Sequence, residues 1–202
     1  MREVPWWGLL SSGTAPGLLI GGWTVAAALQ PTGFDPLVES ISALAGGDAT
    51  DRWVMSLALF GVGVCHVATA MALRPVALAA RLCLAAGGVA TMAVAGLPLP
   101  GGEANSLPHV VAAVSAFLAL AVWPALAGRR SVVPVLRPPF CLIAAGVLVL
   151  LVSWFFIAVL TQAPLLGLSE RLAAGAQSLY PLVVVAVLRR TALISRPAAP
   201  RS

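Results

Sequence analysis

FCLIAAGVLVLLVSWFFIAVL, residues Phe140–Leu160, is long enough to cross a lipid bilayer and contains no charged residue. A membrane-spanning helix needs about 20 consecutive apolar residues, so this stretch predicts a transmembrane helix. Working outward from it, the chain holds five more apolar runs. We expect six spans, at about 7–29, 53–73, 77–97, 107–127, 140–160 and 171–188. The sequence therefore predicts an all-α, polytopic membrane protein, built as a bundle of six transmembrane helices.

The composition of the 202-residue chain supports the same fold class. Hydrophobic residues make up 60% of it and charged residues only 9%, with a mean hydropathy of +0.98. Soluble domains carry about 25% charged residues. Six spans fill most of the chain, so we expect one membrane domain over residues 1–190 and a disordered cytoplasmic tail over residues 191–202. The net charge of +5 comes from arginines at helix ends, which favour anionic lipid headgroups rather than nucleic acid.

Charge sign alternates from one gap between spans to the next. Every arginine except Arg52 and Arg171 falls near the termini or near the second and fourth gaps. Every acidic residue except Glu3 falls in the first, third or fifth gap. Arginines in short loops stay on the cytoplasmic side of a membrane. We therefore predict a multi-pass membrane protein with both termini in the cytoplasm and the acidic gaps outside.

The first outer gap, residues 30–52, is the longest and reads QPTGFDPLVESISALAGGDATDR. Leu37, Ile41 and Leu44 recur in it at helical spacing, which predicts a short interfacial helix. A charged side chain near hydrocarbon costs a few kcal/mol, so polar groups on this helix must reach water, a partner or a substrate. The alternative is an ordinary interfacial helix with a solvated acidic side. Its polar stripe would consist of Asp35, Glu39 and Ser42.

The sequence Ser169-Glu170-Arg171 precedes the sixth span. Ser169 suits the N-cap of a helix, and an acid such as Glu170 is favoured at a positive helix end. Arg171 is unfavourable there unless it pairs with an acid of the first gap or with a lipid headgroup. Gln177 lies on the same helical face as Glu170, deeper in the membrane. We predict an outward-opening pocket whose substrate-binding residues are Asp35, Ser42, Arg171, Gln177, Trp154 and Phe155.

The two histidines lie at different depths. His109 begins the fourth span at the level of the acidic gaps, where an imidazole suits proton transfer; the alternative is a simple interfacial residue. His66 lies mid-membrane, and we expect it to be hydrogen-bonded to a neighbouring helix. The sequence contains no metal-binding motif of the HxxH, HExxH or aspartate-rich kind, and its cysteines lack CxxC spacing. We therefore predict neither a metal nor another cofactor.

Four short motifs resemble those of small six-span bacterial membrane proteins catalogued as domain of unknown function 998. They are DPLVESISAL at Asp35–Leu44, Trp53-Val54-Met55, His109, and GLSER at Gly167–Arg171. The resemblance extends to span number and gap lengths over nearly the whole chain. It implies a six-span membrane fold and no particular activity.

In layout the chain is also similar to membrane-integral meroterpenoid cyclases, which carry one acid early and one late and protonate an epoxide or alkene without metal. This similarity implies a terpene-cyclase-like enzyme for an isoprenoid or other lipid-like substrate, with Glu39, Glu170 and His109 as catalytic residues. Trp154, Phe155 and Phe156 would form an apolar wall that tolerates a cation. Because Arg171 favours the ionised form of the adjacent Glu170, we expect Glu39 to be the proton donor.

Two alternatives to an enzyme remain open at this point. One is a non-catalytic membrane protein that binds lipid or a protein partner. The other is a transporter of a small solute, although the spans show no internal repeat. An apolar cavity closed on its inner side would favour the enzyme, and a polar path through the membrane would favour transport. Membrane lipids and a hydrophobic small molecule are the expected partners, and association of several copies of the chain is left open.

Overall fold

The computed structural model describes residues 3–31, 33–101, 106–128, 131 and 133–194. Within these residues it contains helices and no strand. The long helices are α1 (Trp6–Ala28), α2 (Trp53–Ala72), α3 (Leu78–Gly96), α4 (Leu107–Ala127), α5 (Pro138–Thr161) and α6 (Leu166–Ile194). Two single-turn 3-10 helices, η1 (Ala43–Ala45) and η2 (Pro134–Leu136), lie in the connections.

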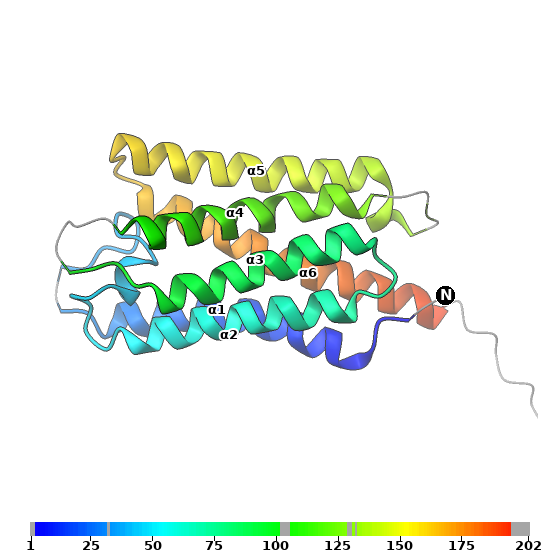
Figure 1. The fold of residues 1–202 in the computed structure, drawn as a ribbon, viewed down its shortest axis with the longest axis horizontal. Helices are drawn as coiled ribbons and strands as arrows, with labels where there is room; N and C mark the ends of the chain where they lie inside the picture. Colours follow the sequence, from blue (N-terminus) through cyan, green and yellow to red (C-terminus); the bar gives the residue numbers. More distant parts are fainter. Residues whose placement is uncertain (1–2, 32, 102–105, 129–130, 132, 195–202) are drawn as a thin grey trace, which may run out of the picture.

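The six long helices form a closed bundle (Figure 1). Each packs on the next along the chain, and α6 completes the ring by packing on α1. The N-terminus and the end of α6 lie at one end of the bundle, which we call the terminal end. The long connection between α1 and α2 lies at the opposite end, the loop end.

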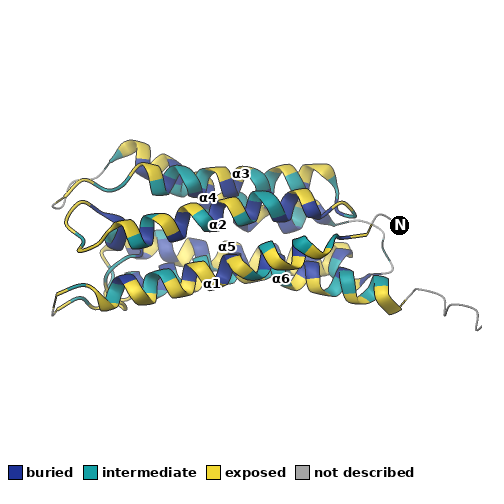
Figure 2. Cartoon of the chain, turned by 90° about the horizontal axis from the view of Figure 1, so that it is seen from below, coloured by how far each residue is buried: buried dark blue, intermediate teal, exposed yellow. Residues whose placement is uncertain are grey.

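Five of these helices, α2 to α6, are long and apolar enough to cross a membrane. The remaining helix, α1, is of similar length, but glycine, serine, threonine, proline and tryptophan residues lower its hydropathy. Together the helices form a polytopic membrane bundle, which confirms the predicted fold class. The surface fits a lipid environment, because many large apolar side chains are exposed along the outside of the helices. Figure 2 shows that exposed and buried positions alternate along each helix, with the buried ones facing the bundle.

Two details differ from the sequence-based expectation. The helix expected in the first gap is only the single turn η1, and residues 36–39 form turns before it. The sixth helix begins at Leu166, five residues before the predicted span. Both differences have one cause, which is a set of hydrogen bonds between these two segments, described below.

Apolar packing closes the terminal end of the bundle. The buried side chains there come from α2, α3, α4, α5 and α6, together with residues of the connections. Trp123 lies at their centre with no exposed surface, and its ring packs 5.5 Å from that of Tyr180. α2 and α3 approach most closely at Gly63 and Gly88, where a Cβ on either glycine would lie within 2.7 Å of the other's carbonyl oxygen.

Candidate functional site

The turn at Pro36–Glu39 docks directly onto the start of α6. The N–H of Gly167 donates to the carbonyl of Val38 at 3.1 Å, and the N–H of Leu168 donates to the carbonyl of Leu37 at 3.0 Å. N–H groups in the first turn of a helix have no partner within that helix, so the turn acts as its cap. The DPLVESISAL and GLSER motifs, far apart in sequence, thus form one structural unit.

This arrangement corrects the role predicted for Ser169. Because α6 starts at Leu166, Ser169 lies inside its first turn rather than before it. Its hydroxyl donates to the carbonyl of Leu166 at 2.7 Å. The N-cap function predicted for this side chain is therefore carried out by main-chain carbonyls of the docked turn.

Arg171, in the first turns of α6, donates hydrogen bonds to the same turn. Its Nη1 donates to the carbonyls of Pro36 at 2.6 Å, Glu39 at 2.7 Å and Gly167 at 3.0 Å. The partners of Nη1 are thus main-chain carbonyls, whereas the sequence led us to expect a carboxylate or a lipid headgroup. Turn carbonyls that point toward a helix need donors, and a guanidinium group supplies several. Arg171 is a structural clamp and does not line the cavity described below.

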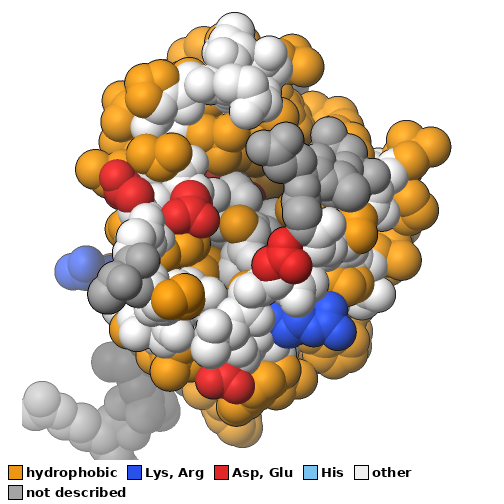
Figure 3. Space-filling model, turned by 90° about the vertical axis from the view of Figure 1, so that its left-hand side faces the viewer, with side chains coloured by type: hydrophobic (Ala, Val, Ile, Leu, Met, Phe, Trp, Pro, Cys, Tyr) orange, Lys and Arg blue, Asp and Glu red, His pale blue; other side chains and the backbone are white. Residues whose placement is uncertain are grey.

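Asp35 and Glu39 also stabilise the turn. The N–H of Leu37 donates to Oδ1 of Asp35 at 2.8 Å, and the N–H of Asp35 donates to Oε1 of Glu39 at 3.1 Å. Glu39 lines a polar surface groove at the loop end, beside Gly47 and Asp48. Figure 3, which faces this end, shows acidic side chains spread over the surface. Glu39 therefore lines this surface groove and not the cavity that Glu170 lines.

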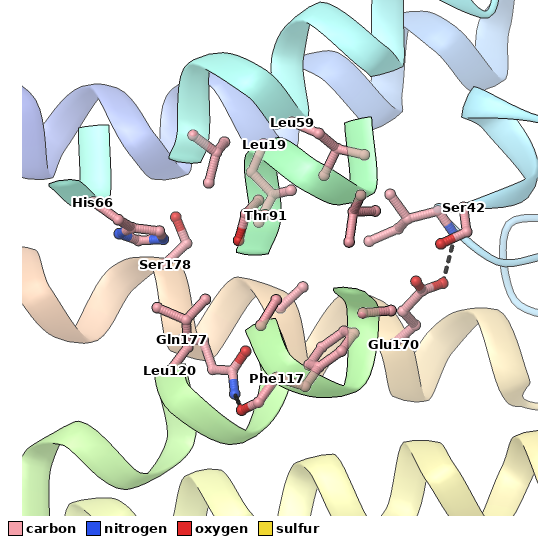
Figure 4. Close-up of a pocket in the computed structure, with 16 residues that line it drawn as sticks. Leu19, Ser42, Leu59, His66, Thr91, Phe117, Leu120, Glu170, Gln177 and Ser178 are labelled. Atoms are coloured by element: carbon pink, nitrogen blue, oxygen red, sulfur yellow. Dashed lines mark hydrogen bonds between the residues drawn. The ribbon is translucent and has the colours of Figure 1, made fainter. Parts of the chain in front are cut away.

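Glu170 is the buried acid of the site. Its side chain is 4% exposed, and its Oε2 accepts a hydrogen bond of 2.5 Å from the N–H of Ile41 (Figure 4). The hydroxyl of Ser42 is within hydrogen-bonding reach of the same carboxyl group. Residues 36–42, which we call the docked segment, therefore bring two donors to this carboxyl group. The rest of the site surrounds the group with apolar side chains.

His109 joins this group through Ser42. Its Nδ1 lies 2.7 Å from the carbonyl of Leu97, and its Nε2 lies 3.3 Å from the hydroxyl of Ser42. A carbonyl oxygen only accepts, so Nδ1 carries a proton, and Nε2 is the ring nitrogen that faces Ser42. Ser42 can accept a proton on one side while it donates on the other. Glu170, Ser42 and His109 thus form a hydrogen-bonded chain capable of proton transfer.

A narrow cavity extends from Glu170 into the bundle (Figure 4). Its walls come from α1, α2, α3, α4, α6 and the docked segment, and they are mainly apolar. The space open to the centres of water-sized molecules is about 60 Å³. The polar groups that line it are Ser42, His66, Thr91, Glu170, Gln177 and Ser178. Gln177, predicted from its helical face, lines the cavity and donates through Nε2 to the carbonyl of Phe117 at 2.7 Å.

The aromatic residues of α5 lie behind this cavity. Phe155 is buried, and its ring packs 5.0 Å from that of Phe117, which does line the cavity. Trp154 is 37% exposed on the outer surface of α5. Because α5 packs on α4 and α6 from outside, its residues support the cavity wall without lining it. Trp154 and Phe155 thus do not line this cavity, whereas Phe117 does, and substrate binding by the α5 residues stays a prediction.

The deep end of the cavity holds residues that sequence reasoning missed. His66 was expected to be hydrogen-bonded to a neighbouring helix, yet its Nδ1 has no partner among the described residues. Ser178 and Thr91, which we had not considered, lie in the same lining. Ser178 follows Glu170 by two helical turns, so its position on the polar face of α6 was the available signal. Within the described residues, no three metal-ligating side chains lie close enough to hold an ion.

A comparison with known protein families identifies the family of this chain. The family described as "Protein of unknown function (DUF998)" matches residues 14–187. The chain belongs to this family. The matched range contains the docked turn, the start of α6 and all residues of the cavity, so the site lies within the part that defines DUF998 proteins. No curated protein and no solved structure matches the chain.

Proposed function

We propose that this DUF998 protein is a membrane-embedded enzyme that acts on a hydrophobic, lipid-like or isoprenoid substrate by metal-independent acid catalysis. The observation that carries the proposal is the position of Glu170, a buried carboxyl group at one end of an apolar cavity inside the bundle. Ionisable groups at membrane depth are costly and typically functional. A carboxyl group with apolar surroundings is also the usual form of a general acid.

In this mechanism Glu170, rather than Glu39, is the proton donor. Its carboxyl proton passes to an alkene carbon or an epoxide oxygen of the substrate, and the positive charge that develops faces the ring of Phe117. When the product alkene forms, the cation returns a proton to the Glu170 carboxylate, which regenerates the acid. Ser42 lies between this carboxyl group and Nε2 of His109, so a proton can move along the three groups during the cycle. The terpene-cyclase-like chemistry suggested by the sequence fits these steps.

Substrate entry requires the docked segment to move. A dry cavity of about 150 Å³ is needed to hold benzene, whereas this one offers about 60 Å³. Ile41 and Ser42 line the cavity from the segment that crosses its outer end, so displacement of that segment would widen it. We therefore treat the present conformation as the closed state of the enzyme.

The closed terminal end favours an enzyme over a transporter. Beyond His66 the bundle is filled by buried apolar side chains, including Leu73, Leu84 and Trp123. A transport path would need polar groups or water on both sides of the binding site. A lipid-binding protein without catalysis is the second candidate, since an apolar cavity suits it equally. The Glu170–Ser42–His109 chain favours catalysis, because binding alone needs no route for protons.

The same proposal includes an orientation in the membrane. We propose that the protein lies in the bacterial plasma membrane with the terminal end in the cytoplasm and the loop end outside. Arg74 and Arg137 flank connections at the terminal end, and Asp35 and Asp48 lie at the loop end. This distribution follows the positive-inside rule. The substrate would therefore enter from the outer leaflet side.

The test compares two matched substitutions, Glu170→Gln and Glu39→Gln, in membranes that contain the full chain. Prenylated alkenes and epoxides are added, and cyclised products are measured by mass spectrometry. We expect Glu170→Gln to lower product formation by at least 100-fold, because the amide keeps the shape but cannot donate the proton. Glu39→Gln should retain most activity, because Glu39 lies outside the cavity.

Equal activity of both variants would eliminate Glu170 as the acid. Binding of a prenylated probe without turnover by the wild-type chain would favour the non-catalytic candidate. Binding measured on the same variants separates these cases, since Glu170→Gln should leave the affinity for the probe within a few-fold of wild type.

A further inference from the structure

His66 and Ser178 form a pair of buried polar groups at the deep end of the cavity. Each is 1% exposed, His66 on α2 and Ser178 on α6. Figure 4 shows the two side chains close together, at the end of the pocket away from Glu170. Neither Nδ1 of His66 nor Oγ of Ser178 has a hydrogen-bond partner among the residues that the structure describes.

Two such groups in one place require an explanation. A buried donor or acceptor without a partner costs about 1–3 kcal/mol, so native structures rarely leave one. Other polar side chains in the cavity wall are satisfied: Thr91 donates to the carbonyl of Gly87 and Gln177 to that of Phe117. The unsatisfied pair comes from two helices and lines the same cavity, which points to a polar atom bound between them.

The hydrogen-bonding capacity of His66 and Ser178 indicates which functional group could bind between them. A neutral imidazole nitrogen either donates or accepts, and a serine hydroxyl does both. A hydroxyl group can donate to one and accept from the other. A carboxylate or phosphate would be buried here without a cation, since the charged residue of the cavity wall is Glu170. An apolar group would leave both atoms unsatisfied.

We propose that His66 and Ser178 form a polar subsite that binds a hydroxyl group of the hydrophobic substrate, opposite the acid. The inference rests on the proposed function insofar as the cavity must admit a hydrophobic molecule. Ser178 follows Glu170 by eight residues, which corresponds to about 12 Å along the helix. The substrate class is therefore an isoprenoid-like alcohol whose hydroxyl lies about 12 Å from its reacting double bond or epoxide.

The experiment uses farnesol, whose terminal double bond can lie about 12 Å from its hydroxyl, and the hydrocarbon with the same carbon skeleton that lacks the hydroxyl. Binding to the full chain in lipid nanodiscs is measured against partition into empty nanodiscs, which removes the difference in solubility. We expect the wild type to prefer farnesol by roughly tenfold, as two net hydrogen bonds allow. Ser178→Ala should lower this preference several-fold, and His66→Leu with Ser178→Ala should abolish it while hydrocarbon binding remains.

Ser115→Ala is the matched control. Ser115 is exposed on α4 and donates to the carbonyl of Val111 in its own helix, so its loss should leave the preference unchanged. If His66→Leu proves unstable, Ser178→Ala alone decides the outcome.

Three results would overturn the subsite. Equal binding of both probes by the wild type would remove the subsite and leave the hydrophobic cavity of the proposed function intact. A preference for farnesol that survives the double substitution would place the hydroxyl elsewhere, and water alone would then satisfy the pair. Binding of neither probe would reject the subsite and the proposed substrate class together.

Discussion

Gly167 sits at the most crowded contact of the loop end. A Cβ at this position would collide with the carbonyl oxygen of Glu39 and would lie 2.6 Å from that of Pro36. Both oxygens belong to the turn that caps α6, and both are held by Arg171. The absence of a side chain at this one residue is therefore what permits the turn to dock.

We expect Gly167→Ala to destabilise the protein by about 1–3 kcal/mol, because neither main-chain oxygen can yield as a flexible side chain would. The measurement is thermal unfolding of the purified chain in detergent. Gly21→Ala provides the control, since a Cβ on Gly21, within α1, has nothing within 4 Å. That variant should be neutral or more stable by up to about 1 kcal/mol, as alanine is in helices. Equal effects of the two substitutions would contradict the docking argument.

Residue identity alone predicted part of this site. Glu170 and His109 were recognised because acidic and imidazole side chains are rare at membrane depth, and Ser42 because it falls on the polar stripe of the expected interfacial helix. Their connection through Ser42 was not visible, since spacing within a segment says nothing about which segments meet. Glu39 was expected to be the proton donor because Arg171 favours the ionised form of its neighbour Glu170 and because Glu39 falls on the predicted interfacial helix. Its side chain instead accepts a hydrogen bond from its own turn, a local alternative that helical spacing does not reveal.

At the level of elements, the docked turn caps α6, and Ile41 and Ser42 directly after it cover the cavity. The turn is attached by two hydrogen bonds from the start of α6 and by the Arg171 guanidinium, and the N–H of Ile41 donates to Glu170. The turn itself has little apolar packing, because Leu37 and Val38 are exposed at 48% and 45%. A segment held mainly by hydrogen bonds opens more readily than a packed helix. Loss of one attachment should therefore loosen the cover without unfolding the bundle.

Arg171→Met tests this, since methionine keeps an apolar stem and removes the donors. A cysteine placed at Ile41, which is 3% exposed, reports on opening through its rate of maleimide labelling. We expect Arg171→Met to raise that rate roughly tenfold, because hydrogen bonds from a charged donor contribute about 1.5–3 kcal/mol. Arg52→Met, another arginine of the loop end, should leave it unchanged, and the chain without the Ile41 cysteine gives the background. An unchanged rate in Arg171→Met would show that the guanidinium does not hold the cover.

The helices themselves were predictable from apolar runs, because span length follows from bilayer thickness. Their ends were less so. The sequence favoured a start of the last span at Arg171, whereas α6 begins at Leu166. The extra turn exists because main-chain carbonyls of the distant segment 36–39 complete it, a tertiary effect. Tertiary packing was equally hard to predict at Trp154. Its apolar character was clear from the sequence, but the sequence did not show which face of α5 packs on the bundle.

For the whole molecule, the bundle has two unlike ends. The terminal end is filled by apolar side chains around Trp123, and at the loop end Ile41 donates a hydrogen bond to Glu170. Under the proposed function, a cavity blocked at the terminal end would exchange molecules only through the loop end. The orientation of the bundle would then decide which leaflet supplies the proposed substrate.

The orientation itself can be measured with cysteines at Ala49, in the connection at the loop end, and at Leu193, near the end of α6. We expect a membrane-impermeant maleimide to label the Ala49 cysteine in intact cells and the Leu193 cysteine only after permeabilisation. Arginines cluster at the terminal end, and moving them across the membrane during insertion is unfavourable. The unsubstituted chain gives the background from Cys65, Cys83 and Cys141, which lie within helices. Labelling of Leu193→Cys but not Ala49→Cys in intact cells would reverse the orientation. The cavity would then face the cytoplasm, and its substrate would come from the inner leaflet.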